Sequence, residues 1–369
     1  MRKVFKLIFL LIGMIILISF GILLYKEIKP KKPEIETLKK EGRETYFEET
    51  KPETETTKTS ETITTSSQEA TTTKTNLKTP NLLIDTIILY PKVDYPFIYG
   101  YDPTNKVIKA YNLEDKTYKE ILKKENIKGL SFSENNLLAL IKDENYWLLD
   151  IFKDKLNRLP LNVKNSFWVN NDLYLFISSP EANYLAKFDN NNLKKITDIY
   201  ILNPVFDYLE DGIVYYENLK NTNFSPLYFI KNYKEKIQIL EPKTNLSAIS
   251  NKKDLIYVSY YENGWKSYII NKDGQKIIEF NFGTLKEKCT FKDLLICGVP
   301  KNQDFSNLED WYYYKKIFSD KLVIFDPKNL DLKYYDIEGN FDIVNPTLTP
   351  IGVIFFNRND AKLYVIPIK

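Results

Sequence analysis

The chain has 369 residues, with 52 Lys and Arg against 49 Asp and Glu, no His and two Cys. A net charge of +3 gives no electrostatic reason to expect a nucleic-acid partner. Without His there can be no Ser-His-Asp or Cys-His catalytic arrangement, and two Cys cannot complete a Cys₄ zinc site or an iron–sulfur cluster. The excess is aromatic, with 27 Tyr and 22 Phe, which favours β-strands.

A long apolar run follows a basic N-terminal tail. Residues 1–6 contain three basic side chains, and the next eighteen residues carry no charge. Eighteen helical residues reach about 27 Å. With the flanking apolar side chains, this is enough for a hydrocarbon core of about 30 Å. The sequence therefore predicts a cytoplasmic tail at residues 1–6 and one transmembrane helix at residues 7–25.

A cleaved signal peptide is the alternative for this segment. Its apolar region would be about 7–15 residues long and would end in small residues, whereas residues 23–26 read Leu-Leu-Tyr-Lys. We therefore expect an uncleaved anchor. The basic tail favours a cytoplasmic N-terminus, and long domains translocate largely regardless of their charge. The predicted location is the cell membrane, with a single span and the following domain outside the cytoplasm.

Residues 26–80 have the composition of a tether. The stretch from Glu53 to Thr75 is almost entirely Thr, Ser, Glu and Lys. Such a stretch has too little apolar surface to offset the entropy of ordering. We expect a disordered linker that holds the next domain away from the membrane, with a reach of about 40 Å. A binding or modification site within the linker is the alternative.

From residue 86 onward, β-branched and aromatic runs alternate with turn residues, and one run recurs. The copies begin 36 to 42 residues apart, except that 59 residues separate the starts of the last two. A second strand follows each copy, a third follows in the first six units, and a short apolar run before the next turn supplies a fourth. The copies are Phe97–Tyr101, Leu137–Ile141, Leu173–Ile177, Ile213–Glu217, Leu255–Ser259, Leu294–Gly298 and Val353–Asn357.

A period near 40 residues with four antiparallel strands per unit is typical of a β-propeller. The sequence predicts an all-β fold, a seven-bladed β-propeller of four-stranded blades at residues 81–369. Because the last unit ends after its second strand, we expect Leu82–Ile84 and Ile87–Tyr90 to pair with the last blade and close the ring. Two β-sandwiches are the alternative, but they have no reason to keep this period.

About 19 extra residues interrupt the sixth unit, measured against the period near 40. This insertion carries the densest aromatic cluster of the chain. The cluster and the acidic residue before it are Asp310, Trp311, Tyr312, Tyr313 and Tyr314. Propeller loops carry function on a rigid scaffold, and aromatic side chains make contact surfaces for proteins or sugars. We predict a binding surface here, and the alternative is that the aromatic side chains fold back and cover the blade edge.

Cys289 and Cys297 flank one predicted hairpin. A loop at residues 292–294 would place them opposite each other, with Cα atoms about 4.5 Å apart and within disulfide reach. Outside the cytoplasm a disulfide is expected. A slip of one residue would put the two side chains on opposite faces, which leaves two buried thiols as the alternative. A catalytic Cys is not expected, because no His is present to form the thiolate.

A motif in the sixth unit resembles a known group of proteins. It runs from Cys297-Gly298-Val299-Pro300 through Asp310-Trp311-Tyr312 to residues 318–322. Together with the N-terminal span, this pattern resembles the membrane-anchored TolB-like, WD-type β-propeller proteins of bacteria. Tyr314 and Lys315 stand where that pattern would have a Gly. The resemblance covers residues 80–369 and implies a propeller without established catalytic residues.

Carboxylates are the remaining candidates for acid–base chemistry. Three adjacent pairs stand out, which are Glu114-Asp115, Glu210-Asp211 and Glu309-Asp310. Glycoside hydrolysis needs two carboxyl groups about 5–10 Å apart around a cleft, whereas neighbours on a strand point to opposite faces. We therefore expect solvated turn or loop residues. Calcium-loop, phosphate-loop and dinucleotide motifs do not occur, so we expect no catalytic residue, no metal site and no cofactor.

Three functions are compatible with these features. The leading hypothesis is a membrane-tethered, extracytoplasmic propeller that binds a protein or an envelope polymer such as a glycan. The first alternative is an envelope hydrolase or lyase, which needs carboxylates from different blades at the channel mouth, at least one of them shielded from water. The second is a structural scaffold of a membrane complex, which would present a wide exposed apolar patch.

Overall fold

The computed structural model describes residues 71–73, 77–189, 191–218, 224–303 and 311–368. The predicted transmembrane helix at residues 7–25 and most of the predicted tether lie outside these ranges. Within the described ranges, no helix is long and apolar enough to cross a membrane.

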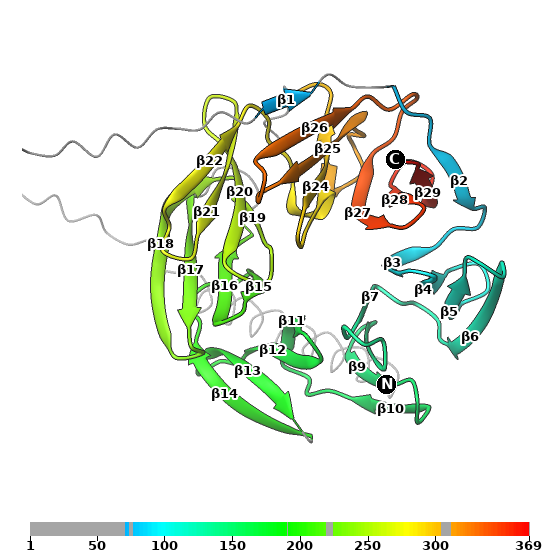
Figure 1. Cartoon of the computed structure of the whole chain (residues 1–369). Coiled ribbons are helices and arrows are strands. Elements are labelled where there is room, and N and C mark those ends of the chain that lie inside the picture. Colours follow the sequence, from blue (N-terminus) through cyan, green and yellow to red (C-terminus); the bar gives the residue numbers. More distant parts are fainter. Residues whose placement is uncertain (1–70, 74–76, 190, 219–223, 304–310, 369) are drawn as a thin grey trace, which may run out of the picture. The chain divides into compact units, whose positions relative to one another are not determined.

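The chain divides into two compact units, Met1–Ile63 and Thr64–Lys369, and all described residues belong to the second. Seven antiparallel sheets of four strands form this unit, and one of them carries a fifth, parallel strand. The sheets are arranged as a ring in Figure 1. This confirms the predicted seven-bladed β-propeller and rules out the two sandwiches.

Each of the first six blades runs in chain order from its inner strand to its outer strand. Blades one to three are β3 (Leu89–Asp94), β4 (Phe97–Asp102), β5 (Val107–Asn112) and β6 (Thr117–Lys123); β7 (Gly129–Phe132), β8 (Leu138–Lys142), β9 (Tyr146–Asp150) and β10 (Lys155–Arg158); β11 (Val163–Val169), β12 (Asp172–Ser178), β13 (Asn183–Asp189) and β14 (Asn192–Asp198). Blades four and five are β15 (Pro204–Leu209), β16 (Gly212–Glu217), β17 (Phe224–Lys231) and β18 (Glu235–Thr244); β19 (Ser247–Ser250), β20 (Leu255–Tyr261), β21 (Trp265–Asn271) and β22 (Lys276–Phe280).

The last two blades are completed by strands from the N-terminal side of the chain. Blade six is β23 (Cys289–Phe291), β24 (Leu295–Pro300), β25 (Asp320–Asp326) and β26 (Asp331–Tyr335), with β1 (Thr71–Thr73) parallel to β26. Blade seven is β27 (Ile343–Thr349), β28 (Gly352–Asn357), β29 (Lys362–Ile366) and β2 (Asn81–Ile84). The described part of the predicted tether therefore includes a strand that lies against blade six.

Of the two segments predicted to close the ring, one pairs with the last blade and the other does not. β2 pairs antiparallel with β29, so Leu82–Ile84 does join the last blade. The second expected segment, Ile87–Tyr90, does not form a strand there, because Leu89 and Tyr90 begin β3, the inner strand of blade one. The reason is that β27 supplies the inner strand of blade seven, so the blade lacks only its outer strand.

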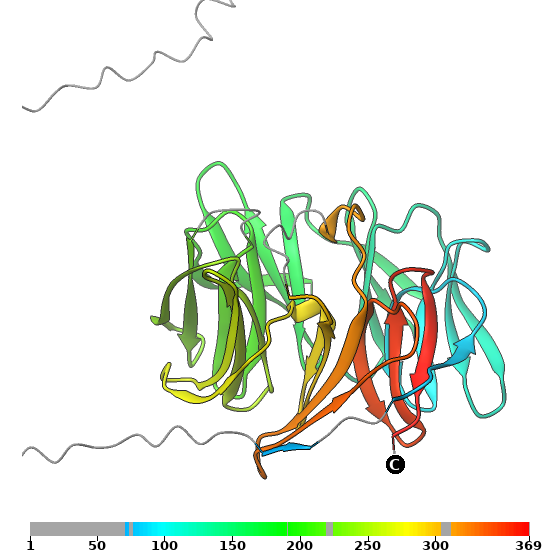
Figure 2. The same cartoon turned by 90° about the horizontal axis from the view of Figure 1, so that it is seen from above.

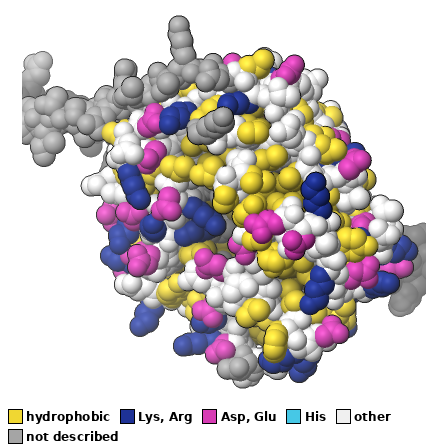
Figure 3. Space-filling model, turned by 45° about the vertical axis from the view of Figure 1, so that its right-hand side comes forward, with side chains coloured by type: hydrophobic (Ala, Val, Ile, Leu, Met, Phe, Trp, Pro, Cys, Tyr) yellow, Lys and Arg dark blue, Asp and Glu magenta, His cyan; other side chains and the backbone are white. Residues whose placement is uncertain are grey.

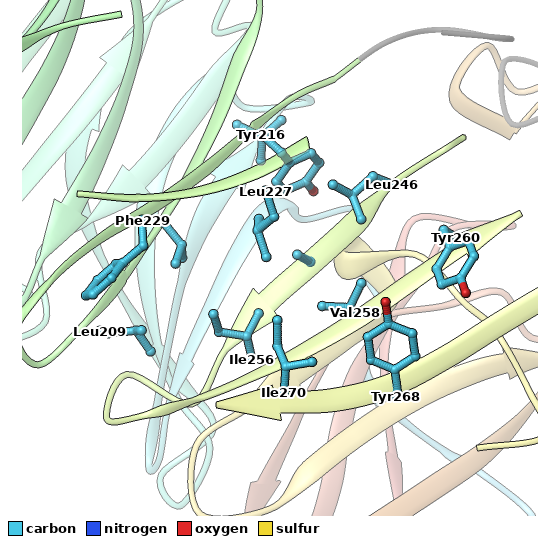
Figure 4. Packing of buried hydrophobic residues seen from close by; sticks show 13 residues of the cluster. Leu209, Tyr216, Leu227, Phe229, Leu246, Ile256, Val258, Tyr260, Tyr268 and Ile270 are labelled. Atoms are coloured by element: carbon cyan, nitrogen blue, oxygen red, sulfur yellow. The ribbon is translucent and has the colours of Figure 1, made fainter. Parts of the chain in front are cut away.

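The core lies between the blades. Because successive side chains of a strand point to opposite faces, Ile213 and Tyr215 of β16 pack toward blade three, and Val214 and Tyr216 pack toward blade five. Figure 4 shows the packing between blades four and five, where Phe229 and other labelled side chains fill the space between two sheets. Strands buried on both faces explain why the repeated runs are largely apolar at consecutive positions instead of only at alternate positions.

Candidate functional site

The predicted binding loop lies only partly at the surface. Asp310 is outside the described residues. Trp311 is only 3% exposed and packs with Leu285 and Phe318, whereas Tyr314 is 69% exposed. The indole Nε1 of Trp311 donates a hydrogen bond of 2.8 Å to Asp342 Oδ2. Its indole is thus a buried anchor that joins the insertion to blade seven.

The other aromatic side chains of the insertion also have partners in the fold. The Arg358 guanidinium lies 3.8 Å from the ring centroids of both Trp311 and Tyr314, a doubled cation–π contact. The Tyr312 hydroxyl donates to Glu287 Oε2 at 3.2 Å, and burial raises the pKa of Tyr312 well above its usual range. Tyr313 is 52% exposed. The insertion is therefore attached to blades six and seven, on the face away from β1 in Figure 2.

A fully buried charge cluster lies beneath the insertion. Lys288, at the end of η1 (Lys286–Lys288), is 0% exposed, and its Nζ contacts Asp320 Oδ2 at 2.5 Å and also Asp342 Oδ1. Asp320 Oδ2 additionally accepts the backbone N–H of Ile343 at 2.6 Å. One ammonium group therefore joins two carboxylates, one at the start of β25 in blade six and one just before β27 in blade seven. The sequence gives no indication of this cluster, because single charged residues carry no local sign of burial.

Asp320 gives the stability of the fold a pH dependence of defined sign. Burial raises the pKa of the Asp320 carboxyl to about 6, with the Lys288 charge opposing and the Asp342 charge adding to this effect. Because this pKa lies above the value in the unfolded chain, the Asp320 carboxyl binds its proton more tightly in the folded chain. The free energy of unfolding that this proton contributes is therefore lost as the pH rises from about 4 through 6.

We expect the Asp320→Asn variant to gain roughly 3 kcal/mol in free energy of unfolding relative to the native chain when the pH rises from about 3 to about 7. The amide does not titrate, so this part of the pH dependence disappears. Denaturant unfolding of both chains at several pH values measures the difference. An identical pH profile for the two chains would contradict the assignment.

The two cysteines form a disulfide between neighbouring strands of blade six. Cys289 and Cys297 stand directly opposite each other in the register of β23 and β24, with Cα atoms 4.1 Å apart. The loop between the strands spans residues 292–294, as the sequence predicted. Both residues are at most 2% exposed, so the bond lies inside the blade.

A cavity of about 730 Å³ opens on the other face of the ring, which we call the axial cavity. Six blades line it with the ends of their inner strands and the turns that follow. Figure 3 views this side of the propeller obliquely and shows Lys, Arg, Asp and Glu side chains around a hollow. The turns are residues 95–96, 133–137, 170–171, 210–211, 251–254 and 292–294.

Hydrogen bonds join these turns from one blade to the next, which makes the rim of the axial cavity continuous from blade one to blade six. The bonds, in order around the ring, are Asn136 Nδ2 to Asp94 Oδ2 at 2.5 Å, Glu134 N to Asn170 O at 3.1 Å, Tyr208 Oη to Asn170 Oδ1 at 3.0 Å, Glu210 N to Lys253 O at 3.1 Å and Lys253 Nζ to Asp293 Oδ1 at 2.9 Å.

Charged groups of both signs line the axial cavity in equal number. The lysines are Lys92, Lys252, Lys253 and Lys292, and the acidic residues are Asp94, Glu134, Glu210 and Asp293. All four acidic side chains are exposed. Carboxylates from different blades therefore do meet at a channel mouth, but none of these four is shielded from water, and the shielding is what a carboxylate acid or base requires.

The acidic pairs seen in the sequence are not brought together. Glu210 lines the axial cavity, while its neighbour Asp211 accepts from Lys272 Nζ at 2.6 Å. Glu114 and Asp115 are exposed turn residues, as predicted. Glu309-Asp310 lies outside the described residues.

Sequence reasoning also missed the aromatic side chains of the cavity, Phe132, Trp168, Tyr208 and Tyr233. A usable signal existed for the first three. They stand within two residues of the turn that ends an inner strand, and this turn recurs in every repeat.

Solved structures of similar shape support the fold. The β-propeller domain of the trilobed protease from Pyrococcus furiosus is 14% identical over 76% of this chain and 94% of that chain, with a TM-score of 0.53. The Cps50 (Swd1) β-propeller domain from Myceliophteria thermophila is 10% identical over 79% of this chain and 100% of that chain, with a TM-score of 0.50. At such low identity these similarities show the β-propeller fold alone.

TolB from Acinetobacter baumannii is also similar, at 14% identity and a TM-score of 0.40, over 53% of this chain. The match covers 55% of TolB, so the chain spans about half of that protein's length. No protein-family model matches the chain, and no curated protein matches its sequence.

Proposed function

We propose that this chain is a binding module, a β-propeller tethered to the cell membrane that holds a protein or an envelope polymer in its axial cavity. Residues 7–25 would anchor it, residues 26–70 would space it from the membrane, and the propeller would face away from the cytoplasm. The observation that carries the proposal is the axial cavity, in which side chains from six blades surround one opening. Loops and turns on a rigid scaffold are where binding residues concentrate, and pockets of this size accommodate ligands.

The burial of the carboxylates favours binding over the hydrolase or lyase alternative. A general acid near neutral pH needs a carboxyl group whose pKa is raised by removal from water, in reach of a substrate. The acidic side chains of the axial cavity are exposed. Among the described residues the buried carboxylates are Asp102, Asp320 and Asp342, all at most 2% exposed. Asp102 is paired with Lys109, and the other two are bonded to Lys288, so a substrate has no path to them.

The disulfide supports the extracytoplasmic part of the proposal. Disulfides persist in oxidising compartments and are rare in the cytosol. The link between Cys289 and Cys297 fits the topology that the apolar run and the polar tether predict. Both native cysteines are buried, so a topology experiment needs an introduced thiol. The variant Thr57→Cys in the tether should react with a membrane-impermeant maleimide in intact cells if the propeller lies outside.

Site-specific photo-crosslinking tests the binding role. The full chain would carry a photoreactive phenylalanine derivative in place of Lys292, which is exposed at the axial cavity, and in a second version in place of Phe152, which is 85% exposed and outside it. We expect a discrete crosslinked product in living cells from position 292 and none from position 152. The product should disappear when Tyr233→Ala is added. Equal crosslinking at both positions would contradict binding through the cavity.

A further inference from the structure

The axial cavity contains charges that the fold itself does not neutralise. Lys253 pairs with Asp293 of blade six, and Lys252 pairs with Asp207 in β15 of blade four. Two lysines and three acids of the cavity are left without an ion-pair partner among the described residues, and these are Lys92, Lys292, Asp94, Glu134 and Glu210. The Lys92 Nζ instead donates to the backbone oxygens of Ser133 and Glu134, at 2.5 and 3.0 Å.

Charges of both signs without an ion-pair partner favour a ligand without net charge. A polyanion would meet Asp94, Glu134 and Glu210, and a polycation would meet Lys92 and Lys292, so either would experience like-charge repulsion. A hydroxyl group both donates and accepts. A ligand rich in hydroxyl groups can therefore accept from the ammonium groups and donate to the carboxylates at the same time.

The aromatic side chains of the axial cavity are held in fixed positions. Trp168 Nε1 donates to Ser131 Oγ at 3.1 Å, and the Tyr208 hydroxyl donates to Asn170 Oδ1 at 3.0 Å. Tyr233 stacks on Tyr174 with ring centroids 6.0 Å apart. Rings that are immobilised before binding lose little further entropy when they pack against an apolar ligand surface. The C–H faces of sugar rings offer such a surface beside their hydroxyl groups.

The backbone of the cavity rim disfavours an extended peptide. A peptide that is added as a strand needs unpaired N–H and C=O groups along a sheet edge. At this rim the groups already pair between blades, since Glu134 N donates to Asn170 O and Glu210 N donates to Lys253 O, both at 3.1 Å. Recognition must therefore use the side chains, which suits a ligand with hydroxyl groups around each ring.

We propose that the axial cavity binds a neutral oligosaccharide, as part of an envelope glycan. This inference rests on the proposed binding role and names its ligand class. The exposed charges Glu210 and Lys292 would hold hydroxyl groups, and the fixed aromatic side chains would contact the ring faces. The volume of about 730 Å³ lies within the range of ligand pockets, about 300–1,000 Å³.

The test uses the full chain, purified in a detergent without a sugar head group. It is applied to an array of neutral oligosaccharides of two to six rings, and affinities for the strongest binder are measured by calorimetry. Polygalacturonate and a Glu-rich peptide serve as anionic probes. We expect binding to neutral glycans and at least tenfold weaker binding in the variants Glu210→Ala and Lys292→Ala. The control variant Tyr200→Ala, at a side chain 81% exposed and outside the cavity, should stay within twofold.

Both cavity variants change exposed side chains, and thermal unfolding verifies that they are folded. Absence of binding to every neutral glycan overturns the inference, as does binding of the anionic probes alone or binding that neither variant weakens. The crosslinking experiment separates this failure from failure of the proposed function. A protein crosslinked at position 292 in the absence of glycan binding would keep the binding role and reject the sugar ligand.

Discussion

Replacing Lys288 by Met is expected to lower the free energy of unfolding by about 3–5 kcal/mol, because it leaves two buried carboxylates without their counter-charge. Asp320 and Asp342 are both 0% exposed, and the Lys288 ammonium contacts each of them. Met has a similar length, so loss of packing contributes little. Denaturant unfolding of the two chains at pH 7 measures the change.

The control for this variant is Lys286→Met, two residues earlier in η1 and half-buried, for which we expect a change within about 1 kcal/mol. Adding Asp320→Asn and Asp342→Asn to Lys288→Met should recover part of the loss, because the buried charges are then removed together. A Lys288→Met chain as stable as the native one would show that the cluster is not closed to water.

Replacing Trp311 by Ala should also destabilise the propeller by about 3–5 kcal/mol, the usual range for a buried aromatic side chain. The indole is 3% exposed, donates to Asp342 Oδ2 and lies against the Arg358 guanidinium at 3.8 Å. Its loss therefore removes packing and leaves a buried carboxylate oxygen with fewer donors. Thermal and denaturant unfolding measure the effect.

The control is Phe152→Ala, at a side chain 85% exposed, which should change the free energy of unfolding by less than about 1 kcal/mol. The same pair of variants separates the two interpretations of the insertion. A structural anchor predicts loss of stability with binding at the axial cavity preserved wherever the chain is folded. If the Trp311→Ala chain is as stable as the native chain but no longer binds, Trp311 contacts the partner, as the sequence predicted.

The repeat could be recognised from the sequence because the strands of one blade are consecutive in the chain and joined by short turns. The run at Leu173–Ile177, for example, appears as the centre of β12, and the turn before it at residues 170–171. The opposition of Cys289 and Cys297 followed from the same local geometry, since the length of a hairpin loop sets its register. The prediction for Ile87–Tyr90 is wrong because each recurring run is the second strand of its blade. The inner strand of blade seven, β27, therefore precedes the last run and already completes that side of the blade.

The sequence by itself determined the all-β class, the number of blades, the source of the closing strand and the position of the insertion. These follow from hydrophobic periodicity and turn residues, which act over short distances along the chain. Only the tertiary structure decided that Trp311 is buried, that Lys288 joins Asp320 to Asp342, and that Lys92, Tyr233 and Lys292 share one cavity. The physical reason is that these groups meet through the closure of the ring, and burial and charge pairing depend on neighbours that are distant in the sequence.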